Sequence, residues 1–363
     1  MTRENTVGII GAYGMTGSVV SKEIMRTTDL NLVVGGRDEG RAASLATELG
    51  VRATARKVDI YDENSLMSFC ESCSLIVNCT APSARILDIV VKGALRAGSH
   101  YVDPGPAMVE NLLPYGTDFE QASLIGLIYT GWLPGVTGLA LHHVYSLARD
   151  SFDGIQSVNV YFEDRSAWSE AAFVDMAEEM AQGSPTGMFE NGVWKDQNMI
   201  RVTRTYEFPP PVGKRRVLAA YSHELEELAK EARIPEMGMY IGLISLGVLL
   251  NVAVIKTLKM DPEKAAGRLR KAWVKAGKKL GEDGIVVAEA AGKKGSRETR
   301  VRLSLYSKSP YFMTGLPTAI SVRAILENKV RERGLNLMCD AVDSAYFFGE
   351  FEKAGVTYEL VEI

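Results

Sequence analysis

The chain has 363 residues, of which 46% are hydrophobic and 24% charged; these values exclude a disordered protein and favour two lobes over one core. Its net charge of −4 gives no electrostatic case for nucleic-acid binding. Four cysteines in a chain of this length do not indicate a disulfide framework.

The first predicted unit is a strand, a glycine-rich turn, a helix and a second, parallel strand. An apolar run over residues 7–10 precedes three glycines spaced three apart, and a second apolar run covers 30–34. This order opens a dinucleotide-binding domain: the first glycine allows the turn, the second lets the backbone approach a pyrophosphate, and the third lets helix and strand pack closely. N–H groups at the helix start would face the phosphates. The residues expected to contact the cofactor here are Gly11, Tyr13, Gly14, Met15, Thr16 and Gly17.

The end of the second strand selects between NAD and NADP. An NAD site usually has a carboxylate there for the ribose 2′-OH, whereas a 2′-phosphate favours an arginine. The chain offers Gly36 and Arg37, with Arg41 one helical turn further on. We therefore predict NADP as the cofactor. The alternative is NAD, which would use Asp38 as the ribose carboxylate.

Strand and helix signals continue to alternate through the first half of the chain, as a parallel sheet requires. The predicted helices cover 40–49, 64–73 and 85–97, and the predicted strands cover 53–58, 75–78, 100–102 and 124–129. A further apolar helix begins at Val136, after a glycine- and proline-rich turn over 131–135.

Ligands of an open parallel sheet bind outside the carboxyl ends of its strands. Asp59 and Ile60 follow the third strand, where we expect them to meet adenine. For Asp59 and Asn78, an ordinary loop role is the alternative. The loop after the fourth strand has small residues that leave room for the nicotinamide ribose, and its candidate contacts are Asn78, Thr80, Ala81 and Pro82.

Asp103 is the candidate catalytic carboxylate. It ends the fifth strand beside Pro104 and Pro106, where nicotinamide and substrate should meet. A carboxylate there could bind a substrate ammonium or transfer a proton. The alternative is an aspartate that caps a turn.

The second half of the chain predicts a mostly antiparallel lobe, with strands over 158–163, 202–207, 285–291 and 300–306 and helices over 262–281 and 318–328. Residues 237–255 carry no charge and are long enough to span a membrane. Glycines and Asn251 within this run, and the lack of a second such segment, favour a buried or dimer-interface helix instead. The N-terminus enters its first strand at once and leaves no room for a signal peptide, so we expect a cytoplasmic protein.

His223 is one of four histidines and a plausible proton shuttle. It does not stand in an H-E-x-x-H motif and no second ligand cluster accompanies it, so we predict no metal site. No tyrosine is followed four residues later by lysine, which excludes the catalytic pair of the short-chain reductases.

These motifs resemble the saccharopine dehydrogenase family of NADP-binding type. The similarity covers the whole chain loosely and is strongest in the first 140 residues. Residues 131–135 look like the family's G-x-x-P-G turn. The other similar segments are 11–17, 35–37, 78–82, 93–103 and 311–326.

The resemblance implies an α/β protein with a Rossmann-type lobe over 1–135, a mixed α/β substrate and dimerisation lobe over 136–310, and a return to the first lobe over 311–363. It implies a homodimer that transfers hydride at the C–N bond of a small amino-acid-derived imine or amine. Some members carry a histidine–glutamate pair near the substrate. The resemblance carries this role over to His223, as acid or base, and to Glu224, as a substrate contact. We also expect Asp103 to orient the substrate nitrogen, and Trp132 and Pro134 to contact the substrate.

Two other functions remain open at this point. A branch resembling trans-acting enoyl reductases shares the glycine-rich opening, which would make the chain a C=C reductase. A non-catalytic protein could also keep the nucleotide lobe and bind NADP(H) without turnover. The chain departs from the family in having no clear arginine cluster for a dicarboxylate substrate.

Overall fold

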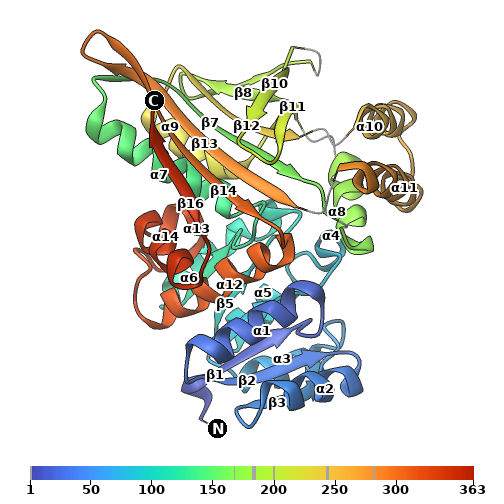
Figure 1. Ribbon diagram of the computed structural model, residues 1–363. Helices are drawn as coiled ribbons and strands as arrows, with labels where there is room; N and C mark the ends of the chain where they lie inside the picture. Colours follow the sequence, from blue (N-terminus) through green and yellow to red (C-terminus); the bar gives the residue numbers. More distant parts are fainter. Residues whose placement is uncertain (1, 167, 182–184, 199–200, 243–244, 281–282) are drawn as a thin grey trace. The chain divides into compact units, whose positions relative to one another are not determined.

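The computed structural model describes residues 2–166, 168–181, 185–198, 201–242, 245–280 and 283–363 (Figure 1). The chain divides into two compact units. Unit 1 comprises Met1–Gly135 and Tyr311–Asp343, and unit 2 comprises Val136–Pro310 and Ser344–Ile363.

Unit 1 is a parallel seven-stranded sheet in the order β15-β6-β5-β4-β1-β2-β3, with helices in the connections (Figure 1). Its strands are β1 (Thr6–Ile10), β2 (Asn31–Gly36), β3 (Ala53–Lys57), β4 (Leu75–Asn78), β5 (His100–Asp103), β6 (Ile125–Ile128) and β15 (Gly334–Leu337). Its helices are α1 (Met15–Thr27), α2 (Glu39–Leu49), α3 (Glu63–Glu71), α4 (Ser83–Ile86), α5 (Ile89–Arg96), α6 (Gly116–Gln121), α12 (Pro310–Leu326) and α13 (Met338–Ala341).

The sequence explains why β1 and β4 form the centre of this sheet. Both are mainly apolar, and every residue of each is buried, as expected for strands covered on both faces. The chain leaves β1 to form β2 on one side and later returns to form β4 on the other. The carboxyl ends of β1, β2, β4 and β5 therefore surround the topological switch point, where ligands of such sheets bind. The α/β fold class and the Rossmann-type sheet are confirmed.

Unit 2 is built on a mixed sheet in the order β10-β11-β12-β7-β13-β14-β16, in which β12 and β7 pair in parallel and the other pairs on this path are antiparallel. Its strands are β7 (Gly154–Asp164), β8 (Gly187–Glu190), β9 (Val193–Asp196), β10 (Thr203–Phe208), β11 (Gly213–Ala220), β12 (Glu236–Gly242), β13 (Gly284–Lys294), β14 (Arg297–Ser307) and β16 (Tyr358–Glu362). Its helices are α7 (Val136–Ser151), α8 (Glu170–Ala181), α9 (His223–Ala232), α10 (Leu246–Leu258), α11 (Pro262–Leu280) and α14 (Ser344–Lys353).

Two helical layers complete unit 2. The apolar face of α7 packs on β7, β13 and β14, so this helix covers one face of the sheet (Figure 1). Helices α8, α10 and α11 form a separate small bundle around Phe173, Leu269 and Trp273.

The end of the chain differs from the predicted return of 311–363 to the first lobe. Helix α12 and β15 belong to unit 1, but residues 344–363 belong to unit 2. There β16 pairs with β14, with Leu360 opposite the buried Leu303. This pairing covers what would otherwise be an exposed edge of β14, which explains why the last strand leaves the nucleotide lobe.

The uncharged run 237–255 is not the single helix that we predicted. Its first part is β12, where Tyr240 stacks on Tyr161 of β7 with ring centroids 5.1 Å apart. Its second part is α10, which begins after Ser245, whose hydroxyl accepts a hydrogen bond from Val248 N at 3.2 Å. Apolar residues at successive positions fit either element, and sheet pairing decides for the first part. None of the helices described here is long and apolar enough to span a bilayer.

Candidate functional site

The glycine-rich turn joins β1 to α1 in a geometry that other residues would not allow. Gly11 has a positive φ of 78°, and a Cβ on it would lie 2.5 Å from the carbonyl oxygen of Cys79. A Cβ on Gly17 would lie 2.3 Å from the Gly11 carbonyl oxygen, so α1 packs directly on the turn. Gly14 is the N-cap of α1 and provides no side-chain cap. The main-chain N–H groups of the first helical turn therefore have no side-chain cap, and such groups can bind an anionic ligand.

Tyr13, predicted as a cofactor contact, lies at the end of β2. Its ring fills the space where a Cβ of Gly36 would stand, 2.4 Å from the nearest ring atom. Its hydroxyl accepts a hydrogen bond from Asp38 N at 3.0 Å. The guanidinium of Arg41 lies over the ring, 4.4 Å from its centroid, and donates to Tyr13 O at 3.3 Å.

Asp38 uses its carboxylate to cap α2. Its Oδ1 accepts a hydrogen bond from Arg41 N at 3.0 Å, as an N-cap aspartate should. The neighbouring Arg37 is exposed. The end of β2 therefore carries two cationic side chains, Arg37 and Arg41, and the Asp38 carboxylate that caps α2.

Asp59, predicted to meet adenine, is engaged in its own loop. Its Oδ1 accepts a hydrogen bond from Tyr61 N at 3.0 Å, and its N–H donates to Ser65 Oγ at 3.1 Å. Ile60 is buried beside it. These contacts are those of a turn-forming aspartate, so a role toward adenine stays a prediction.

A buried network joins the ends of β4 and β5. Asp103 Oδ2 accepts hydrogen bonds from Tyr101 Oη at 2.7 Å and from Asn78 Nδ2 at 2.8 Å, while its Oδ1 accepts from Gly105 N at 3.0 Å. Thr80 N donates to Asn78 Oδ1 at 3.2 Å. Burial, helped by the nearby Asp103 charge, raises the pKa of Tyr101 well above its ordinary value, so the phenol stays a donor. The network fixes the two loops in which the catalytic and ribose contacts were predicted.

The turn over 131–135 is attached to the same strand ends. Thr130 N donates to Asp103 O at 3.1 Å, and Gly131 N donates to Pro134 O at 3.1 Å. Thr318 Oγ1 of α12 donates to Thr130 O at 3.0 Å. Trp132 is only 3% exposed. The loops after β4, β5 and β6 therefore form one rigid edge of the sheet in unit 1.

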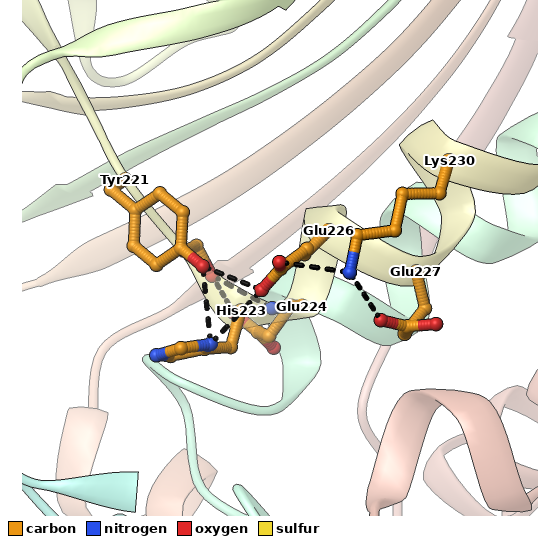
Figure 2. A network of polar contacts seen from close by, with 7 residues as sticks. Tyr221, His223, Glu224, Glu226, Glu227 and Lys230 are labelled. Atoms are coloured by element: carbon orange, nitrogen blue, oxygen red, sulfur yellow. Dashed lines mark hydrogen bonds and ion pairs between the residues drawn. The ribbon is translucent and has the colours of Figure 1, made fainter. Parts of the chain in front are cut away.

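The predicted acid or base, His223, lies in unit 2 within a polar cluster formed by α9 and by Tyr221, which precedes this helix (Figure 2). Its Nδ1 lies 3.2 Å from Tyr221 Oη and 3.3 Å from Glu226 Oε2. Tyr221 Oη donates to Glu226 Oε2 at 2.6 Å, and Lys230 Nζ lies 2.9 Å from Glu226 Oε1. Burial raises the pKa of Glu226, but the hydrogen bonds from Tyr221 and Lys230 outweigh it and lower the pKa overall.

Glu224, the predicted substrate contact, is buried and serves the start of α7. Its Oε2 accepts a hydrogen bond from Thr137 Oγ1 at 2.7 Å and its Oε1 accepts from Gly138 N at 2.8 Å. Ser222 Oγ donates to Oε2 at 3.2 Å. A carboxylate at a helix N-terminus is stabilised by the N–H groups and by the helix dipole. Substrate contact by Glu224 stays a prediction.

The comparison with known families decides what the glycine-rich unit is. Residues 7–126 match the model of the saccharopine dehydrogenase NADP binding domain. This region belongs to that domain family. The match supports an oxidoreductase with a nicotinamide dinucleotide cofactor. No curated protein sequence matches the chain significantly.

One solved structure is similar in fold to the whole chain. The chain is similar to the apo saccharopine dehydrogenase (L-Glu forming) of Saccharomyces cerevisiae, with a TM-score of 0.72 at 12% identity, covering 98% of this chain and 100% of that one. It is less similar to GenD2 of gentamicin A biosynthesis in complex with NAD, with a TM-score of 0.48 at 12% identity over 99% of this chain and 96% of that one. At such identities the likeness concerns the fold alone.

Two partners of the predicted residues were not predicted from the sequence, Tyr101 and Thr137. Tyr101 stands two positions before Asp103 on β5, so the two side chains point to the same face, and this spacing could have identified it. Thr137 could not have been found in this way, because 87 residues separate it from Glu224.

Proposed function

We propose that the chain is an NADP-dependent oxidoreductase that transfers hydride to or from the C–N bond of an amino-acid-derived imine or amine. The observation that carries this proposal is the glycine-rich turn of a saccharopine dehydrogenase NADP binding domain, followed by Arg37 and Arg41 at the end of β2. When bound, the nicotinamide would supply or accept the hydride, while the protein supplies position and electrostatics.

The residues of the turn fit a dinucleotide. Gly11 and Gly17 leave no Cβ between the turn and α1, so a pyrophosphate can approach the main chain closely. Gly14 leaves the first N–H groups of α1 without a side-chain cap, and Met15 and Thr16 supply N–H groups in that first turn. These donors, together with the helix dipole, would hold the phosphates.

The end of β2 favours NADP over NAD. The Asp38 carboxylate already caps α2, which turns it from a ribose 2′-OH, whereas Arg37 and Arg41 would pair with a 2′-phosphate. Tyr13 would hold Arg41 in place through the ring contact and its carbonyl.

A titration of NADPH and NADH by fluorescence tests this assignment. We expect the double variant R37S/R41S to weaken NADPH binding about 100-fold, because it removes two charge-assisted contacts, and to leave NADH binding nearly unchanged. D38N is the matched control, since asparagine still caps a helix but carries no charge. Unchanged NADPH affinity in R37S/R41S, with weaker NADH binding in D38N, would show an NAD site instead.

Asp103 is proposed to act by fixing the sheet edge on which the nicotinamide and the substrate nitrogen meet. Its carboxylate accepts hydrogen bonds from Asn78, Tyr101 and Gly105, which belong to this edge. Thr80, Ala81 and Pro82 continue from Asn78 and would border the nicotinamide ribose. The Asp103 carboxylate would favour a cationic iminium or ammonium on the substrate.

His223 is the proposed acid or base in the same reaction. Tyr221 and Glu226 hold the ring at Nδ1, which favours the tautomer protonated there and directs proton exchange to Nε2. Glu224, the residue after His223, would fix the start of α7. Trp132 and Pro134 would be further substrate contacts. We expect H223Q to retain NADPH binding and lose at least about 100-fold in turnover, the lower range for a general acid or base. Full turnover in H223Q would remove the histidine from the mechanism.

The proposal includes a cytoplasmic homodimer. Light scattering of the purified chain measures the mass directly, and a monomeric mass at cellular concentration would refute the dimer. Fractionation of cells with an antibody to the untagged chain tests the compartment.

A further inference from the structure

Helix α10 has an apolar side that none of the described residues covers. Val248 and Ile255 are buried in the small bundle with α8 and α11. On the opposite side, Leu246 and Leu250 remain 65% and 58% exposed, and Ala253 continues their line at helical spacing. Leucines exposed on adjoining helical turns form a patch and are not scattered surface residues.

A cationic stripe runs along the neighbouring helix α11. Its members are exposed and follow one another by four, three and four positions, which places them on one face: Lys264, Arg268, Lys271 and Lys275. Arg268 Nε donates to Asn251 Oδ1, so the stripe lies next to α10. Arg270 lies off this stripe and pairs with Glu170.

The local charge is opposite to that of the whole chain. Residues 246–276 contain seven lysines and arginines but only two acidic residues, Asp261 and Glu263, whereas the chain carries a net charge of −4. Asp261 is occupied in capping α11, where its Oδ1 accepts a hydrogen bond from Lys264 N at 3.3 Å. The α10–α11 hairpin is therefore positive as well as apolar.

We propose that the α10–α11 hairpin binds the surface of a membrane that contains anionic phospholipid. Leu246 and Leu250 would enter the boundary between headgroups and acyl chains, and the α11 stripe would meet the anionic headgroups. The hairpin would lie in the plane of the interface, because no described helix can span a bilayer. This inference does not depend on the reaction proposed above.

A second copy of the chain fits the surface less well. A two-fold contact through this hairpin places the same patch on both sides, which brings two cationic stripes toward each other. The lipid surface offers apolar and anionic groups together, so it complements both features of the hairpin at once.

Vesicle flotation of the full chain tests the proposal, with phosphatidylcholine alone and with added phosphatidylserine. We expect binding only to the mixed vesicles and loss of that binding at high salt. L246S/L250S should lose at least about tenfold in binding, since two buried leucines contribute to it. K264Q/K271Q should lose roughly 25-fold, because each lysine near an anionic surface contributes about fivefold. V51S, which alters an apolar residue 99% exposed in unit 1, is the matched control and should bind like the unmodified chain.

Three outcomes would overturn the proposal. The first is no flotation with phosphatidylserine at low salt, and the second is unchanged binding by L246S/L250S. The third is a dimer in solution that L246S/L250S converts to monomer while vesicle binding is absent, which would assign the surface to a second copy. Circular dichroism and NADPH titration of each variant verify that the chain is folded, since the altered side chains are exposed.

Discussion

The carboxylate of Glu163 on β7 gives the sharpest prediction about unit 2. Its side chain is fully buried, and neither oxygen has a hydrogen-bond partner within the described parts of the chain. Oε2 lies over Gly242 of β12, only 1.4 Å from the position that a Cβ on this glycine would take. The Nε of Arg215 on β11 lies 3.9 Å from Oε1.

Burial in this position raises the pKa of Glu163 from 4.5 to about 7. The charges of Arg215 and Arg165 lower it, and those of Asp164 and Asp283 raise it, but desolvation dominates. Between pH 4.5 and about pH 7, Glu163 is therefore protonated in the folded protein but ionised in the unfolded chain. Stability contributed by the protonated group is present below pH 4.5 and is lost as the pH rises toward 7 and above. The full effect is about 3 kcal/mol, most of which falls between pH 5 and pH 8.

E163Q should abolish this pH dependence, because the amide has the same size and does not titrate. We expect the free energy of unfolding of the unmodified chain, relative to E163Q, to fall by about 2–3 kcal/mol between pH 5 and pH 8. Urea titrations followed by tryptophan fluorescence measure it, since three of the four tryptophans, at 168, 194 and 273, lie in unit 2. E207Q, at an exposed glutamate of β10, is the control and should leave the pH dependence unchanged. An equal difference in stability between E163Q and the unmodified chain at both pH values would show that Glu163 does not titrate in this way.

Three further predictions concern the nucleotide turn, the buried network and the start of α7. G17A should abolish measurable NADPH binding in titrations, because its Cβ would lie 2.3 Å from Gly11 O, whereas G40A, at an exposed glycine of α2, should bind normally. Y101F should lower stability by about 1–3 kcal/mol in urea titrations, since Asp103 loses a buried donor; a loss below measurement error would contradict the network. T137V should lower the free energy of unfolding by about 1–3 kcal/mol, because the hydrogen bond to Glu224 is lost. If the loss in T137V/E224Q equals the sum of the losses in the two single variants, the two side chains do not interact.

The nucleotide lobe could be predicted from the sequence because its determinants are local. Gly11 needs a positive φ, and Gly17 needs the absence of a side chain, so the spacing of the glycines already implies the turn. The mainly apolar runs of β1 and β4 likewise indicate strands covered on both faces. The order of strands then follows from the usual connections of parallel sheets.

The remaining features depend on contacts between residues far apart in the chain. Residues 237–242 form a strand because β7 and β11 lie on either side, and an uncharged run contains no sign of those neighbours. The final strand pairs with the edge of β14, with Leu360 opposite Leu303, and no local pattern in the sequence identifies β14 as an edge strand. No pattern in the sequence indicates that Thr137 and Gly138 of α7 hydrogen-bond to the Glu224 carboxylate, because 87 and 86 residues separate them from it.

The central claim is hydride transfer at a C–N bond, and an isotope-transfer experiment measures it most directly. The purified chain is supplied with NADPH deuterated at nicotinamide C4, in both stereoisomers, and with a panel of amino acids paired with 2-oxo acids that form imines. A parallel panel of enoyl thioesters tests C=C reduction. We predict an amine product that carries deuterium on the carbon bonded to nitrogen, from one stereoisomer only. Deuterium found only in a saturated thioester, or in no product while NADPH binds tightly, would contradict the account.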